Sequence, residues 1–132
     1  DDRIEGININ FVNLDDKEKG FELFKDLKKT NVTSSFVHNI ELGGFGADKV
    51  YAIEDICTRL GISQERECLV MGDSLNDLKM IENSRLSYAM KNADEKVKKA
   101  ARYIADFNYN DGVAQVIEKL LKDDAFGKGR QI

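Results

Sequence analysis

An apolar run, Cys68-Leu69-Val70-Met71, lies between two segments that have the spacing of amphipathic helices. A short continuous apolar run is typical of a strand buried on both faces, as strands of parallel sheets are. Before the run, apolar residues recur at helical spacing from Val50 to Leu60, and Gly61 then provides a common helix stop. After it, a helix is expected over about residues 76–82. This alternation predicts an α/β fold with a parallel sheet and flanking helices.

The same alternation continues toward the C-terminus. Residues 86–90 and 103–105 have the composition of short strands, Asp94 can cap a helix that runs to about Arg102, and residues 113–121 form a closing helix. Residues 123–132 have little periodicity, so we expect a frayed, flexible tail there.

The first third of the chain is organised differently. An expected strand has one apolar face formed by Ile7, Ile9 and Phe11, and Asp15-Asp16 can cap a helix that runs to about Lys29. A second expected strand has a face formed by Phe36, His38 and Ile40. We place a boundary at residues 43–47, where glycines cluster. Residues 1–46 are then a β-α-β piece, residues 47–122 are successive αβ units, and residues 123–132 are the tail.

Composition narrows the class of protein. The chain has 132 residues, 42% hydrophobic and 33% charged, which is typical of one globular domain. Its net charge of −4 is mild and lysines alternate with acids, so we expect no nucleic-acid partner. The apolar runs are too short to cross a bilayer and residues 1–5 do not resemble a signal peptide, so we expect no membrane partner and a cytoplasmic location. Cys57 and Cys68 are interpreted as buried, reduced thiols.

The side chains most suited to binding or catalysis lie in the stretch Gly72-Asp73-Ser74-Leu75-Asn76-Asp77, which we call the acidic turn. Ligands of open α/β sheets bind beyond the carboxyl ends of strands, where this turn is expected. Carboxylates there suit a hard cation such as Mg²⁺, which takes one or two protein carboxylates. Spacing alone leaves a second interpretation open, in which Asp73 or Ser74 caps the next helix and Asp77 complements its dipole.

Lys49 is the second candidate. It is expected at the start of a helix, where the positive end of the helix dipole is unfavourable for a cation. A phosphate or an acidic cluster nearby would account for the placement. A solvated surface lysine is the simpler interpretation if Lys49 is considered in isolation.

Together these residues resemble the haloacid dehalogenase (HAD) superfamily, in its large-capped, Cof-like sugar-phosphatase branch. The resemblance covers residues 46–121 and includes Lys49, the acidic turn, Met90-Lys91-Asn92-Ala93 and Asp111-Gly112-Val113-Ala114, in the family's order. It implies a partial HAD-like Rossmannoid core, preceded by a β-α-β remnant of the cap domain in residues 1–46. It also implies a Mg²⁺-dependent hydrolase of small-molecule phosphate esters, sugar phosphates above all.

The resemblance also implies residue roles. Asp73 would ligate Mg²⁺, and Asn76 would hydrogen-bond the phosphoryl group or the nucleophilic carboxylate. Asp77 would orient a metal-bound water or Lys49, and Lys49 would neutralise charge on the transferring phosphoryl group. Asn92 and Asp111-Gly112 are interpreted as structural, and His38 as a polar residue of a cap strand.

The family's nucleophile motif, Asp-x-Asp-x-Thr/Val, is absent from the sequence, and so is its second phosphate-binding motif. The nearest approach is Asn13-Leu14-Asp15-Asp16, where an amide would stand in the nucleophile position. We therefore expect the chain to be inactive alone, as a fragment or a reduced relative. The strand at residues 68–71 would lack a neighbour, so we expect self-association or a missing N-terminal segment that completes the sheet. An inactive Mg²⁺- or phosphate-binding module is the alternative to an enzyme. A receiver-like phosphoacceptor is a weaker option, because the acidic pair and acceptor that it needs are not found.

Overall fold

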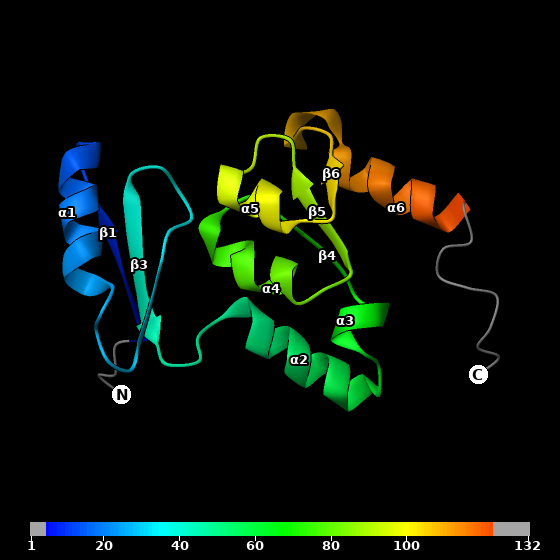
Figure 1. Cartoon of the computed structure of the whole chain (residues 1–132), viewed down its shortest axis with the longest axis horizontal. Helices are drawn as coiled ribbons and strands as arrows, with labels where there is room; N and C mark the ends of the chain where they lie inside the picture. The colour runs from blue at the N-terminus through cyan, green and yellow to red at the C-terminus, as the bar shows by residue number, and fades with distance from the viewer. Residues whose placement is uncertain (1–4, 123–132) are drawn as a thin grey trace.

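A computed structural model describes residues 5–122 of the chain. They form two three-stranded sheets that are consecutive in the sequence (Figure 1). Residues 5–44, the antiparallel unit, hold the first sheet, and residues 49–122, the parallel unit, hold the second. The chain crosses once from one unit to the other, through residues 45–48. The predicted flexible tail, residues 123–132, lies outside the described residues.

In the antiparallel unit, β3 is the central strand and pairs antiparallel with β1 on one side and β2 on the other. Its elements are β1 (Gly6–Asn10), α1 (Leu14–Phe24), β2 (Thr30–Thr33) and β3 (Asn39–Gly44). Helix α1 lies beside β3, whose Ile40 is fully buried. Gly20 allows this close packing, because a Cβ there would lie 2.7 Å from the ring of Phe11.

Three predictions for this unit were wrong. Asn13, not Asp15-Asp16, caps α1, since its side-chain oxygen accepts the N–H of Asp16 at 2.9 Å. The helix ends at Phe24 instead of about Lys29, and Lys29 takes a left-handed φ of 60° where the chain turns into β2. Strand β2 was missed because its sequence, Thr-Asn-Val-Thr, has one apolar residue, and its pairing with β3 stabilises it.

The second expected strand face was also wrong in part. Strand β3 begins at Asn39, so Phe36 and His38 lie before it, in a turn over residues 34–38 that we call the 34–38 turn. Both side chains are exposed. His38 is therefore not a residue of a strand, and its backbone carbonyl accepts the N–H of Phe11 at 2.8 Å.

The parallel unit follows the predicted pattern closely. Its strands run in the order β4-β5-β6, all parallel, with Val70 opposite Ser87 and Ala89 opposite Ile104. The prediction of a parallel sheet with flanking helices is confirmed. The elements are α2 (Lys49–Leu60), α3 (Gln64–Glu67), β4 (Leu69–Gly72), η1 (Leu75–Asp77), α4 (Leu78–Glu82), β5 (Leu86–Met90), α5 (Glu95–Ala100), β6 (Tyr103–Ala105), η2 (Asn108–Asn110) and α6 (Gly112–Lys122).

Local signals explain several of these boundaries. Gly61 takes a left-handed φ of 67° and ends α2, and Asp94 caps α5 by accepting the N–H of Lys96 at 2.8 Å. The core lies between the sheet and its helices, and its innermost members are Ile81, Ala89 and Val97. Helix α4 packs between α2 and α5, whereas α6 packs beside β6 (Figure 1).

Strand β4 is an edge of the parallel sheet among residues 5–122, because it pairs with β5 alone. Val70 is buried, but Leu69 and Met71 are only half-buried, so the strand is less covered than predicted. Apolar side chains also remain exposed on β6 and α6: Tyr103, Ile104, Val113, Ile117 and Leu121. Cys57 and Cys68 are free thiols, as predicted, but only Cys57 is buried, because Cys68 is half-buried at the start of the edge strand.

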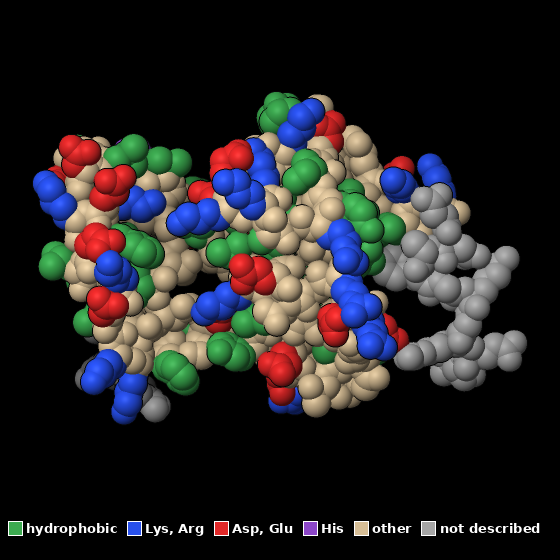
Figure 2. All heavy atoms as spheres, viewed as in Figure 1, with side chains coloured by type: hydrophobic (Ala, Val, Ile, Leu, Met, Phe, Trp, Pro, Cys, Tyr) green, Lys and Arg blue, Asp and Glu red, His purple; other side chains and the backbone are tan. Residues whose placement is uncertain are grey.

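On the face shown in Figure 2, Lys and Arg side chains are interspersed with Asp and Glu over both units. Within residues 5–122, every helix is too short or too polar to pass through a bilayer.

Candidate functional site

The acidic turn lies beyond the carboxyl end of β4, the edge of an α/β sheet where ligands bind. Gly72 is needed there because of a close approach. A Cβ on Gly72 would lie 2.4 Å from the Cβ of Asp77 and 2.8 Å from its Oδ2. The structure thus uses Gly72 to make room for the Asp77 carboxylate.

Asp77 holds the turn together. Its side chain is only 7% exposed. Its Oδ2 accepts the backbone N–H groups of Asp73 at 3.0 Å and Ser74 at 3.2 Å. Its Oδ1 accepts from the Lys49 ammonium at 2.5 Å. Both oxygens are therefore engaged, so Asp77 braces the backbone around Asp73.

Lys49 is the first residue of α2 and points to the acidic turn. Besides its ion pair with Asp77, its ammonium donates to Oδ1 of Asn76 at 3.4 Å. Its ion pair with the Asp77 carboxylate compensates the unfavourable helix-dipole placement. Asp48 caps α2 and pairs with Lys79 at 2.6 Å, and this hydrogen bond raises the pKa of Lys79. The structure thus brings Lys49, Asn76 and Asp77 together.

Asp73 has the more accessible carboxylate. Its Oδ1 lies 3.0 Å from Oγ of Ser74, and its Oδ2 accepts from Nδ2 of Asn92 at 3.4 Å. Asn92 was interpreted as structural, and it does hold a turn, since its Oδ1 accepts the N–H of Asn108 at 3.2 Å. Its contact with Asp73 is an addition that the sequence did not reveal. The Asp73 carbonyl accepts the N–H of Asp94 at 2.8 Å, which fixes the loop after β5 beside the acidic turn.

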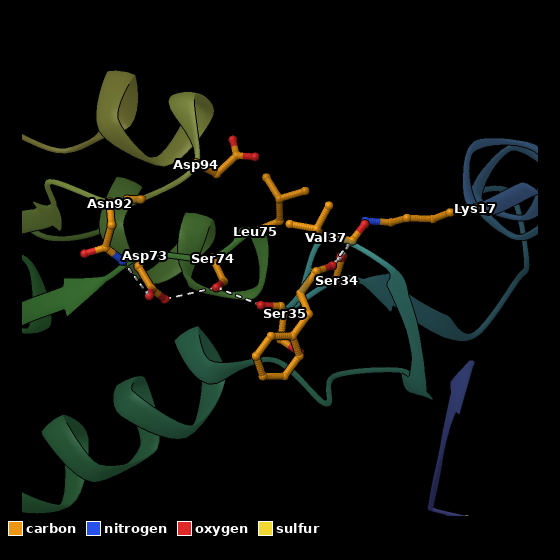
Figure 3. A pocket seen from close by; sticks show the side chains of 11 residues that line it. Lys17, Ser34, Ser35, Val37, Asp73, Ser74, Leu75, Asn92 and Asp94 are labelled. Atoms are coloured by element: carbon orange, nitrogen blue, oxygen red, sulfur yellow. Dashed lines mark hydrogen bonds between the residues drawn. The ribbon is translucent and has the colours of Figure 1, made fainter. Parts of the chain in front are cut away.

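Asp73 faces a cleft of about 430 Å³ between the two units (Figure 3). The antiparallel unit contributes α1 and the 34–38 turn, and the parallel unit contributes the acidic turn and the loop after β5. The lining residues are Lys17, residues 34–37, residues 73–75 and residues 92–94. Phe36 and Val37, 75% and 67% exposed, give the cleft an apolar side opposite the carboxylate.

The donor set fits Mg²⁺ in part. Mg²⁺ is commonly held by one or two carboxylates, with waters and substrate phosphates completing its octahedron. Asp73 supplies one carboxylate in an open cleft, whereas Asp77 is occupied by its other partners. Within residues 5–122 there is no cluster of three or more His, Cys, Asp or Glu side chains that could hold a metal ion. The carboxylates that line the cleft are those of Asp73 and Asp94, and Oδ1 of Asp94 already caps α5.

The structure places Asn13, the nearest approach to a nucleophile position, at the N-cap of α1 in the antiparallel unit. It is not at a strand end of the parallel sheet, which agrees with the expectation that the described chain holds no nucleophile at this position.

Asp111-Gly112 is structural, as predicted, and forms the turn before α6. Asp111 takes a left-handed φ of 54° before α6, and a Cβ on Gly112 would lie 2.3 Å from the carbonyl oxygen of Asp106. The pKa of Asp106 is lowered by the N–H of Phe107 and by the side chain of Asn110, both of which donate to its carboxylate.

Residues 2–117 match the haloacid dehalogenase-like hydrolase family. The chain belongs to this family. The resemblance predicted from the acidic turn and Lys49 is thereby confirmed.

Relatives of this HAD-like chain are phosphatases. The 5-amino-6-(5-phospho-D-ribitylamino)uracil phosphatase YcsE of Bacillus subtilis is 38% identical over 107 residues, which is 79% of this chain and 43% of the relative. A phosphoglycolate phosphatase of Methanosarcina acetivorans is 38% identical over 61 residues, 46% of this chain and 26% of the relative. A solved structure of a HAD-like hydrolase from B. subtilis superposes with a TM-score of 0.82 at 30% identity, over 91% of this chain and 43% of that one. The chain thus spans less than half the length of these relatives.

Three residues of the HAD-like site were missed by the sequence analysis: Lys17, Ser35 and the hydroxyl of Ser74. Ser74 was considered as a helix cap and as part of the acidic turn, but its hydroxyl was given no partner. Lys17 and Ser35 belong to the other unit, with no motif around them. A contact between residues 35 and 74, which are far apart in the chain, produces no periodic pattern in the sequence around either residue. Nothing in the sequence could therefore have revealed it.

Proposed function

We propose that this chain is the lysine- and metal-bearing part of a Mg²⁺-dependent phosphatase that hydrolyses phosphate monoesters of small metabolites through an aspartyl-phosphate. The observation that carries the proposal is that Lys49 meets Asn76 and Asp77 at the carboxyl end of β4, in the same turn that carries Asp73. A cation, an amide and an accessible carboxylate at that place suit the charge of a transferring phosphoryl group.

Each residue has a distinct part in this proposal. Bound Mg²⁺ would supply positive charge that polarises the phosphoryl oxygens, and Asp73 would hold it. Lys49, fixed by Asp77, would place an ammonium beside the same oxygens. Asn76 would donate its amide N–H to the phosphoryl group, since its Oδ1 faces Lys49. Asp77 would keep Lys49 and the backbone of Asp73 in position and would not touch the substrate.

We propose that residues 1–46 are the last piece of a cap domain and residues 47–122 the second half of a HAD-like core. The antiparallel sheet, the parallel sheet and the single crossing between them support this division. The aspartate nucleophile would come from another segment that pairs with the free edge of β4, supplied by an N-terminal extension or by an associating chain. The free edge and the absence of an Asp-x-Asp-x-Thr/Val sequence support this.

The substrate class follows from the cleft and the relatives. A volume of about 430 Å³ suits a small organic phosphate, and Phe36 and Val37 offer it an apolar surface. The relatives are phosphatases of a phosphoribitylamino-uracil and of phosphoglycolate, both small phosphate monoesters. We propose the same class for the complete protein.

An inactive Mg²⁺- or phosphate-binding module remains the second candidate. It is favoured by the absence of the Asp-x-Asp-x-Thr/Val nucleophile motif from the sequence.

The test starts with cation binding. Thermal unfolding of the chain is measured with and without Mg²⁺, for the natural sequence, for Asp73→Asn and for the control Asp55→Asn, whose exposed carboxylate pairs with Arg59 on α2. We expect Mg²⁺ to stabilise the first and the control but not Asp73→Asn. The proposed metal site would be refuted if Mg²⁺ changed the thermal stability of all three proteins equally, or of none.

Turnover then separates the two candidates. Hydrolysis of an aryl phosphate is measured for the chain alone and with an added segment of YcsE, taken from the part of that relative which this chain does not match. Activity that depends on the mixture and is lost in Lys49→Met supports the phosphatase. Mg²⁺ binding without any hydrolysis in the mixture supports the module.

A further inference from the structure

We propose that the hydroxyl of Ser74 couples cation binding at Asp73 to the docking of the 34–38 turn on the parallel unit. This inference rests on the proposed metal site and adds a positioning residue to it. Its consequence is that a bound cation tightens the contact between the two units around the cleft.

The central observation is one proton with two acceptors. Oγ of Ser74 lies 3.0 Å from the backbone carbonyl of Ser35 and 3.0 Å from Oδ1 of Asp73 (Figure 3). A serine hydroxyl carries a single hydrogen, so it can donate to only one of these oxygens at a time. One acceptor belongs to the antiparallel unit, and the other is the carboxylate proposed to hold the cation.

The 34–38 turn holds the Ser35 carbonyl in a fixed place. Lys17 donates from its ammonium to Oγ of Ser34 at 3.0 Å and to the carbonyls of Phe36 at 3.3 Å and Val37 at 2.8 Å. Asn39, 1% exposed, accepts the N–H groups of Ser35 at 3.1 Å and Phe36 at 2.9 Å. These hydrogen bonds hold the turn to the antiparallel unit, so the turn and that unit form one rigid element.

On the other side, Ser74 is the N-cap of η1 and forms a capping box with Asp77, as the capping interpretation of the sequence allowed. In that box the Ser74 oxygen accepts, so its hydrogen is still available to donate elsewhere. The N–H of Ser74 donates to Oδ2 of Asp77 at 3.2 Å, and the N–H of Asp77 donates to the Ser74 carbonyl at 2.9 Å. These backbone bonds persist whichever way the hydroxyl points. The hydroxyl can therefore rotate without disturbing the strand end.

The choice between the acceptors depends on the charge of Asp73. A hydrogen bond to a carboxylate is about twice as strong as one to a neutral carbonyl, so without a cation the proton favours Asp73. A cation held by Asp73 would offset that charge and weaken the carboxylate as an acceptor of the Ser74 hydrogen. The hydroxyl then donates to Ser35, and the bond that it forms joins the two units. By linkage, docking of the turn favours cation binding to the same extent.

The experiment is a Mg²⁺ titration of the full chain, followed by amide chemical shifts in solution. In the natural sequence we expect shifts at residues 72–77 and also at residues 34–37, which belong to the other unit. In Ser74→Ala, the shifts at residues 72–77 should persist while those at residues 34–37 are lost. Ser74→Thr keeps a hydroxyl and should restore them.

The outcomes separate this inference from the metal site. If residues 72–77 respond to Mg²⁺ but residues 34–37 do not, or if Ser74→Ala leaves both responses intact, the coupling is wrong and the metal site stands. If neither region responds in the natural sequence, both proposals are overturned. Amide spectra without Mg²⁺ report whether each variant is folded, and a Ser74→Ala protein that unfolds would make Ser74 a residue of the fold and refute the coupling.

Discussion

Gly72→Ala adds one methyl group to the chain and should disrupt the acidic turn. The added Cβ would lie 2.4 Å from the Cβ of Asp77 and 2.7 Å from its Cγ. Ordinary carbon contacts are about 3.5–4.0 Å long, so Asp77 must move by about 1 Å. That displacement breaks the hydrogen bonds of its carboxylate to Asp73 and Ser74 and its ion pair with Lys49.

The magnitude follows from these losses. Overpacking a tight site costs about 1–3 kcal/mol, and hydrogen bonds to a buried charged group contribute about 1.5–3 kcal/mol. Because Lys49 is half-exposed, its ion pair adds little. We expect the free energy of unfolding to fall by about 3 kcal/mol, which lowers Tm by roughly 12 °C for a chain of this size.

Urea unfolding followed by circular dichroism measures the change. Gly44→Ala is the matched control, because a Cβ at Gly44 would meet no atom within 4 Å, and its stability should stay within about 0.5 kcal/mol of the natural sequence. A double-mutant cycle with Asp77→Gly isolates the clash, since that change removes the atom which the new methyl would meet. The reasoning is refuted if Gly72→Ala unfolds with the natural free energy, or if its cost is the same in the Asp77→Gly background.

Three further predictions concern other parts of the parallel unit. Gly112→Ala should lower the free energy of unfolding in urea by more than Gly72→Ala does, because its Cβ would lie 2.3 Å from the backbone carbonyl oxygen of Asp106 and the backbone cannot rotate away. An equal or smaller loss would contradict this. Asp94→Ala removes the cap of α5 and should lower the free energy of unfolding by about 1 kcal/mol, with Asp94→Ser recovering most of it; no loss would mean that the cap is unimportant. The pKa of Lys79 is raised by Asp48, so this pair should stabilise the fold below the ordinary lysine pKa and cease to do so as pH rises through the raised value. When Tm is measured against pH, Lys79→Met should lack that alkaline decline. An unchanged decline would exclude Lys79 as its source.

The parallel unit was predictable because its signals are local. The strand at β4, the stop at Gly61, the cap at Asp94 and the strands at residues 86–90 and 103–105 all come from residues adjacent in sequence. Each depends on a side-chain period or on one residue with a special backbone or capping property. The acidic turn was recognised for the same reason, since its chemically active groups lie within a few residues of one another.

The antiparallel unit was harder to predict because pairing decides its elements. Strand β2 has little strand character of its own, and it exists because Val32 and its neighbours find partners on β3. The expected strand face at Phe36 and His38 failed because Asn39 and Lys17 fold those residues into a turn. In both places tertiary contacts outweighed local propensity.

The sequence by itself determined the family, the alternation of strands and helices, and the identity of Lys49, Asp73, Asn76 and Asp77 as candidates. Only the tertiary structure decided which of them meet: Lys49 pairs with Asp77 across 28 residues, and Ser74 reaches Ser35 across 39. Such contacts depend on how packed sheets and helices bring distant segments together, whereas periodicity and capping act over a single turn of chain. For that reason the chemistry of the site could be anticipated, but the pairing of the two units at its edge could not.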